Sequence, residues 1–241
     1  MFAMGIIWEM DNRSRVTVIL AMTADGKIAD YRHSAARFGS ANDKIHLEKQ
    51  VSLADGVLFG AGTLRAYGTT MTVSNPKLLQ ERIERSQPLQ PVQIVVSRSG
   101  NLNRQWRFFQ QSAPRWLLTT AKGAKFWENK PSFERILISE SFSENDPNIN
   151  IDWLFALTQL RELGMSKLAV LGGGELVASL LAVNAIDEFW LTICPLIFGG
   201  DAPTPVSGSG LIQSQAKQLE LIEVKQIEQE IFLHYRAICE A

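Results

Sequence analysis

The chain has 241 residues, about 1.6 times the length of a ~150-residue domain, so its length allows one large domain or two small ones. Hydrophobic residues make up 46% and charged residues 20% of it, a balance that excludes a disordered chain, a collagen-like chain and a coiled coil. Its 24 basic and 25 acidic residues give a formal net charge of −1, which argues against a broad surface for nucleic-acid phosphates.

Short apolar runs alternate with helix-like stretches along most of the chain. Residues 1–15 show no clear periodicity, and we expect a loosely attached leader there, followed by one domain over residues 16–241. The expected strands are 16–22, 55–60, 92–97, 116–119, 135–139 and 167–171. The expected helices are 42–53, a short one from Thr63, a short one between the strands 116–119 and 135–139, one that begins after the N-cap Asp152, and one through 176–181.

The last third of the chain has a different pattern. Apolar residues alternate with their neighbours in two segments, 189–193 and 231–237. Alternation with a period of two is typical of antiparallel strands that close the edge of a sheet. Because no internal repeat and no long linker are present, one mixed α/β domain is the simplest interpretation.

Three features of the sequence indicate a cytoplasmic protein. No segment reaches the ~18 uninterrupted apolar residues that span a bilayer, since the most apolar stretch, 168–198, contains three acidic residues. Glu9 lies where a signal peptide needs an unbroken apolar core. The two cysteines, Cys194 and Cys239, lie in apolar contexts that suit reduced thiols. We therefore expect no membrane and no nucleic-acid partner.

Two glycine-rich turns, each directly after an expected strand, are the strongest functional signal. The residues concerned are Gly60, Gly62 and Thr63 in the first turn and Gly172, Gly173, Gly174 and Leu176 in the second. Glycines let the backbone approach a ligand closely, and free amides at a helix N-terminus favour an anion. Either turn alone is more often a tight connection, but two turns at the ends of adjacent strands suit the phosphates of a dinucleotide. The Rossmann fingerprint is not present, because the third glycine and the acidic residue ~20 positions later are missing.

The strand 92–97 ends in Ser97 and Arg98. A hydroxyl and a guanidinium at a strand end suit a ribose 2′-phosphate, so these residues favour NADPH over NADH. A solvated turn is an equally good interpretation of these two residues alone.

Two polar groups are candidates for contact with a substrate. Asp25 and Lys27 follow the first strand, where Asp25 is either an ordinary turn residue or a group that positions substrate or supplies a proton. Ser40 and Asp43 precede or begin the next helix, where Asp43 is either a first-turn helix acid or a substrate contact. The histidines and cysteines have no metal-ligand spacing, so no metal is expected.

The order of the motifs resembles a known family. The segments that carry the resemblance are MTADGKIA (22–29), GAGT (60–63), VVS (95–97), LGGG (171–174), IDE (186–188) and PLIFGG (195–200). Together they resemble the reductase domain of bacterial riboflavin biosynthesis, the C-terminal half of a bifunctional deaminase-reductase, which shares the dihydrofolate-reductase fold. The resemblance extends from residue 16 to residue 238.

The resemblance implies an NADPH-dependent reductase, in most cases a homodimer, with a mixed, mostly parallel sheet flanked by helices and antiparallel strands at its C-terminal end. It implies hydride transfer to C1 of the ribosylamino group of 5-amino-6-(5-phosphoribosylamino)uracil, which becomes the ribitylamino product. The cofactor residues on this basis are Gly60, Gly62, Thr63, Ser97, Arg98, Gly172, Gly173, Gly174 and Leu176. The substrate residues are Asp25, Lys27, Ser40 and Asp43, with Asp25 and Lys27 as the expected catalytic residues.

The sequence departs from the family pattern at two places that bear on the substrate. Residues 66–69 (AYGT) stand where the family has an Asp-Asp-Pro element, and Leu171 stands where it often has a glutamate. Two further hypotheses therefore stay open: a dihydrofolate-reductase-like enzyme that acts on a pterin, and a non-catalytic module that binds NADP.

Overall fold

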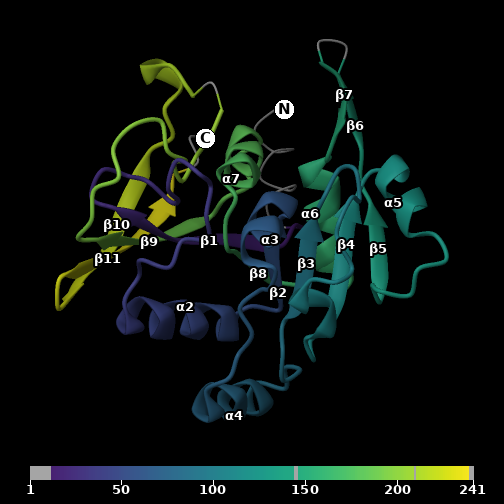
Figure 1. Cartoon of the computed structure of the whole chain (residues 1–241), viewed down its shortest axis with the longest axis horizontal. Coiled ribbons are helices and arrows are strands. Elements are labelled where there is room, and N and C mark those ends of the chain that lie inside the picture. Colours follow the sequence, from purple (N-terminus) through teal and green to yellow (C-terminus); the bar gives the residue numbers. More distant parts are fainter. Residues whose placement is uncertain (1–11, 144–145, 209, 239–241) are drawn as a thin grey trace.

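The computed structural model describes residues 12–143, 146–208 and 210–238. Within these ranges, nine strands form one sheet (Figure 1). In sheet order they are β10 (Leu219–Ile227), β11 (Glu230–Ala237), β9 (Glu188–Cys194), β1 (Arg15–Thr23), β8 (Lys167–Val170), β2 (Gly56–Gly60), β3 (Val92–Val96), β4 (Arg115–Thr119) and β5 (Arg135–Ile138). A separate hairpin, β6 (Ser141–Ser143) and β7 (Asp146–Asn150), projects from the body (Figure 1).

The sheet is parallel from β9 to β5 and antiparallel where β11 pairs with β9 and with β10. The predicted mixed, mostly parallel sheet with antiparallel strands at its C-terminal end is therefore confirmed. The edge of the sheet differs from the prediction. β9 pairs with β1 in the parallel sense on one side and with β11 in the antiparallel sense on the other, so it lies inside the sheet. The edge strand is β10, which the alternation did not predict because both of its faces are exposed.

Six α-helices in the described ranges cover the two faces of the sheet. They are α2 (Ala41–Leu53), α3 (Ala61–Tyr67), α4 (Pro76–Glu84), α5 (Ala121–Trp127), α6 (Trp153–Glu162) and α7 (Gly174–Ala182). Neighbouring residues of one strand point to opposite faces, so Leu58 packs with α6 and α7 whereas Phe59 packs with α2 and α3. No helix within these ranges has the length and apolarity needed to cross a membrane.

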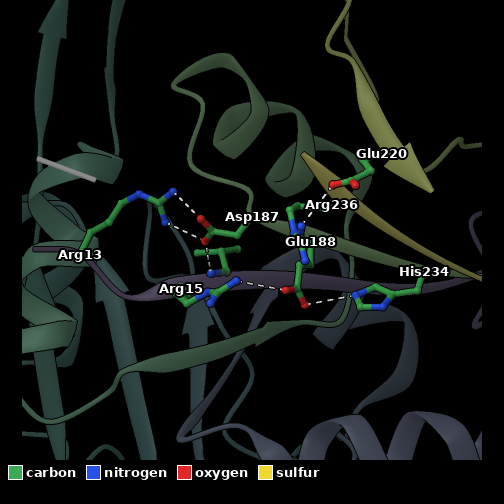
Figure 2. Close-up of polar contacts among 8 residues, drawn as sticks. Arg13, Arg15, Asp187, Glu188, Glu220, His234 and Arg236 are labelled. Carbon is green, nitrogen blue, oxygen red and sulfur yellow. Dashed lines mark hydrogen bonds and ion pairs between the residues drawn. The ribbon is translucent and has the colours of Figure 1, made fainter. Parts of the chain in front are cut away.

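The end of the expected leader is anchored to the domain. Arg13 and Ser14 are buried, and the guanidinium of Arg13 donates two hydrogen bonds of 2.9 Å to the carboxylate of Asp187 (Figure 2). The same carboxylate accepts a 2.7 Å bond from the amide of Val16. For residues 13–15 the prediction of a loose leader is therefore wrong, since a buried guanidinium needs its partner. Residues 1–11 lie outside the described residues.

We expect Asp187→Ala to lower the free energy of unfolding by about 3 kcal/mol, because it leaves the buried Arg13 guanidinium without its carboxylate. Only 4% of the Arg13 side chain is exposed. Glu220→Ala is the control, since its 3.2 Å ion pair with Arg236 is more than half exposed and should contribute less than ~1 kcal/mol (Figure 2). Urea denaturation measures both changes, and equal losses would contradict this interpretation.

Candidate active site

A cleft of about 1660 Å³ lies at the carboxyl ends of the parallel strands. Its walls include the ends of β2, β3 and β8, the N-terminal ends of α3 and α7, and the loop that contains Pro203 and Ser207. Ligands of open α/β sheets bind at this edge, because the loops that follow parallel strands meet there. This cleft is the candidate active site.

The two glycine turns meet in the wall of this cleft. β2 and β8 are parallel neighbours, so the turns that follow them emerge side by side. The amide of Gly60 donates a 3.3 Å hydrogen bond to the carbonyl of Gly172. All seven predicted residues of the two turns line the cleft: Gly60, Gly62, Thr63, Gly172, Gly173, Gly174 and Leu176. The expectation that two distant turns meet in one cleft agrees with this geometry.

The second turn requires glycine at two positions for different reasons. Gly173 has φ = +88°, a conformation that residues with a Cβ rarely adopt, and a Cβ there would lie 3.4 Å from the Thr63 hydroxyl. At Gly174 a Cβ would lie 2.2 Å from Oγ of Ser207. Gly174 therefore lets the Ser207 loop pack against α7, while Gly173 keeps the turn open to the cleft.

Ser97 and Arg98 line the part of the cleft that follows β3. Ser97 is buried, and its carbonyl accepts a 2.6 Å bond from the Thr119 hydroxyl. Arg98 is exposed and donates a 3.0 Å bond to the neutral side-chain oxygen of Asn150. Lys122 adds a second cation to this part of the lining. The arrangement is suited to an anionic ligand.

Asp43, in the first turn of α2, also lines the cleft. Burial raises the pKa of its carboxyl above the ordinary value, although a hydrogen bond from the Thr192 hydroxyl acts in the opposite direction. The negative charge of Glu230 raises the pKa further. A larger share of Asp43 than of an exposed aspartate is therefore protonated at a given pH, as suits a group that donates a proton to a ligand.

Ser40 does not line the cleft, contrary to its expected contact with substrate. Its hydroxyl is the N-cap of α2 and accepts bonds of 3.0 Å and 3.3 Å from the amides of Asn42 and Asp43. The same hydroxyl donates a 2.5 Å bond to Glu230. The sequence did not reveal this role of Ser40, because N-cap serines and ligand-binding serines look alike in a sequence.

Asp25 and Lys27 also lie outside the cleft lining. The exposed carboxylate of Asp25 accepts bonds from the Thr23 hydroxyl at 2.5 Å and from the Gly199 amide at 2.7 Å. These bonds, that from Thr23 foremost, lower the pKa of Asp25 to about 2. Asp25 thus fastens the turn after β1 to the loop that leads to Pro203 in the cleft wall. The roles of Asp25 and Lys27 in substrate binding and catalysis stay predictions.

Several residues of the cleft carried no signal in the sequence. Arg32 and His33 line it from a loop after β1, and Tyr67 lines it from α3. The Tyr67 hydroxyl donates a 2.7 Å bond to the carbonyl of Ala36, which holds that loop against α3. Burial raises the pKa of Tyr67, so the phenol is neutral at physiological pH.

The two departures from the family pattern lie in the cleft. Leu171 lines it at the end of β8, and Ala66 and Tyr67 line it in place of the Asp-Asp-Pro element. The carboxyl groups that the family pattern would supply at these positions are thus replaced by an aliphatic side chain and a phenol. Within the described ranges, no group of three histidine, cysteine, aspartate or glutamate residues could hold a metal ion.

Comparisons with known proteins identify the family. The protein from Archaeoglobus fulgidus named 2,5-diamino-6-ribosylamino-4(3H)-pyrimidinone 5′-phosphate reductase is 28% identical over 206 residues, which cover 83% of this chain and 90% of that protein. The protein of the same name from Methanothermobacter thermautotrophicus is 27% identical over 227 residues, covering 92% and 98%.

Solved structures have the same fold. The deaminase/5-amino-6-(5-phosphoribosylamino)uracil reductase from Thermotoga maritima superposes with a TM-score of 0.74 at 20% identity, covering 97% of this chain and 59% of that one. A family model described as the RibD C-terminal domain matches residues 14–233. The predicted resemblance to a riboflavin-biosynthesis reductase is therefore confirmed, and the chain belongs to the RibD C-terminal domain family.

Proposed function

We propose that the protein is an NADPH-dependent reductase of the riboflavin pathway. Its substrate would be 5-amino-6-(5-phosphoribosylamino)uracil, whose ribosylamino group becomes a ribitylamino group. The single observation that carries the proposal is the meeting of the two glycine turns in a cleft that also contains Asp43, in a chain of this family. The corresponding 2,5-diaminopyrimidinone phosphate is the second candidate, because three relatives are named for it.

The residues present suit a pyridine dinucleotide. Gly62 leaves open space, since a Cβ there would have no atom within 4 Å, and Gly173 leaves the opposite turn without a side chain. The N-terminus of α7, a helix of nine residues, is suited to a phosphate. Ser97 and Arg98 are suited to the 2′-phosphate. When bound, NADPH supplies the hydride that reduces C1 of the open-chain ribosylamino group.

The reaction also consumes a proton, since the nitrogen beside C1 gains one when C1 gains a hydride. Asp43 is the acid that we assign to this step, because it lines the cleft and its raised pKa keeps more of it protonated. Thr192 orients the carboxyl through its hydrogen bond. Apolar side chains such as Leu171 and Leu176 line the wall and help to exclude water from the reacting carbon.

We expect Arg98→Gln to weaken NADPH binding about tenfold and to leave NADH binding unchanged, because only NADPH carries the 2′-phosphate (~1.4 kcal/mol). Arg104→Gln is the matched control, since Arg104 is exposed and lies outside the cleft lining. Isothermal titration with both cofactors measures the four affinities. Equal loss for NADPH and NADH would remove Arg98 from the 2′-phosphate site.

The proposed function is tested by NADPH oxidation with three substrates: the uracil phosphate, the 2,5-diaminopyrimidinone phosphate and dihydrofolate. Turnover with the uracil compound supports the proposal, and turnover with the diamino compound alone supports the second candidate. Turnover with dihydrofolate alone would identify a pterin reductase instead. Tight NADPH binding without any turnover would identify a non-catalytic module, the hypothesis that Leu171 and the missing Asp-Asp-Pro element keep open.

We also propose that the protein acts as a homodimer in the cytoplasm. The edge strand β10 is exposed on both faces and has several apolar side chains, among them Leu221 at 52% and Val224 at 56% exposure. Ile231 of β11 continues this surface at 39% exposure. An uncovered apolar sheet edge is stabilised by a partner, and a second copy of the chain is the partner that the family resemblance implies.

A further inference from the structure

Glu230 is a buried acid that the proposed reaction does not use. It is the first residue of β11, and only 4% of it is exposed. β11 packs beside α2, since the ring centroids of Phe232 and His46 lie 5.1 Å apart. Figure 1 shows where the two elements lie in the fold. Burial of an acid costs folding free energy unless the acid is hydrogen-bonded, so Glu230 needs hydrogen-bond partners.

The contacts of Glu230 lead to the first turn of α2. One carboxylate oxygen accepts a 2.8 Å bond from the amide of Ser40, and the other accepts a 2.5 Å bond from the Ser40 hydroxyl. The thiol of Cys194 lies 3.5 Å from the first oxygen. Ser40 in turn caps the amide of Asp43. A continuous chain of bonds thus joins the C-terminal hairpin to the acid of the cleft.

We propose that Glu230 is a positioning residue, which through its two bonds to Ser40 holds the first turn of α2 so that Asp43 faces the cleft. This inference deepens the proposed function and rests on it for the role of Asp43. Neither the sequence motifs nor the departures from the family pattern point to Glu230.

Of the groups around Asp43, Glu230 is the one whose charge acts on the carboxyl. Cys194 of β9 is a neutral thiol, because burial raises its pKa to about 12. Tyr67 of α3 is a neutral phenol, since burial raises its pKa as well. Thr192 of β9 is uncharged and donates a hydrogen bond. Among the described neighbours that act on Asp43, Glu230 therefore supplies the negative charge.

The test is the titration of the Asp43 carboxyl carbon by NMR in the full chain, with its signal assigned by its loss in Asp43→Asn. Glu230→Gln keeps the shape and removes the charge, so we expect the titration of Asp43 to move down by about one pH unit. The limb of the kcat–pH profile that reports Asp43 should move by the same amount, with NADPH affinity unchanged. Glu220→Gln, on the same hairpin but exposed, should change neither curve.

An Asp43 titration that is identical in Glu230→Gln and in the wild type would overturn the inference. Should Glu230→Gln not fold, Ser40→Ala tests the same chain of bonds, because it removes the hydroxyl that joins Glu230 to the amide of Asp43. An Asp43 titration and a kcat–pH profile that are both unchanged in Ser40→Ala would then contradict the positioning role. The NMR measurement needs no turnover. A failure of this inference can therefore be distinguished from a failure of the proposed function, which the three-substrate assay reports.

Discussion

Asp43→Asn is expected to lower kcat about 100-fold to 1,000-fold, within the range that a positioned general acid contributes. Asparagine keeps the size of the side chain and an oxygen that can accept the hydrogen bond from Thr192, but it has no proton to give. NADPH affinity should stay within about twofold of the wild type, because the cofactor residues lie on the other elements. Stopped-flow NADPH oxidation and equilibrium titration separate the two quantities.

The same variant should be at least as stable as the wild type at pH 7. The raised pKa of Asp43 means that the folded state binds this proton more tightly than the unfolded state, so ionisation of Asp43 costs stability as the pH rises through its folded pKa. Asparagine removes that cost. A melting temperature that is equal or higher, together with lost turnover, is the expected pair of results. Asp201→Asn, an exposed change, should leave both unaltered, and wild-type turnover in Asp43→Asn would exclude Asp43 as the acid.

Gly173→Asp is expected to weaken NADPH binding about 100-fold (~2.7 kcal/mol), because it places a negative charge against the cofactor phosphates. Backbone strain at φ = +88° would also contribute, so the matched control is Gly173→Asn. Asparagine has the same shape and tolerates positive φ better than most residues, but it is neutral. We expect it to weaken binding less than tenfold.

The comparison of these two variants by isothermal titration isolates the charge. If aspartate and asparagine weakened binding equally, the second turn would be a tight connection and not a phosphate site. NADPH affinity unaltered by both would remove this turn from the cofactor site altogether.

The sequence predicted the parts of the fold that depend on local patterns. The β-branched run at 16–22 and the apolar run at 55–60 are β1 and β2, because strands buried on both faces have continuous apolar sequences. The meeting of the two glycine turns could also be expected, since turns after neighbouring parallel strands emerge at one edge. β10 was missed because its exposed faces leave no periodic pattern.

The site was predictable only where backbone geometry marks it. Gly173 has a conformational reason to be glycine and Gly174 a steric one, and a sequence displays both as a run of glycines. Ser40 and Asp25, in contrast, are polar residues with partners far along the chain. Ser40 is bonded to Glu230, 190 residues away, and no local pattern could distinguish that bond from a substrate contact. Long-range pairing decides the role of such residues, and it becomes visible only in three dimensions.

The position of β1 in the sheet has a consequence for how the molecule assembles. Both neighbours of β1 come late in the chain, since Arg15 pairs with Lys167 and Thr17 with Glu188. On a ribosome, this apolar strand emerges before both of its neighbours and waits until about 150 further residues have been made. Such distant pairing slows folding, so nascent chains of this protein should depend on chaperones more than chains whose first strand pairs locally.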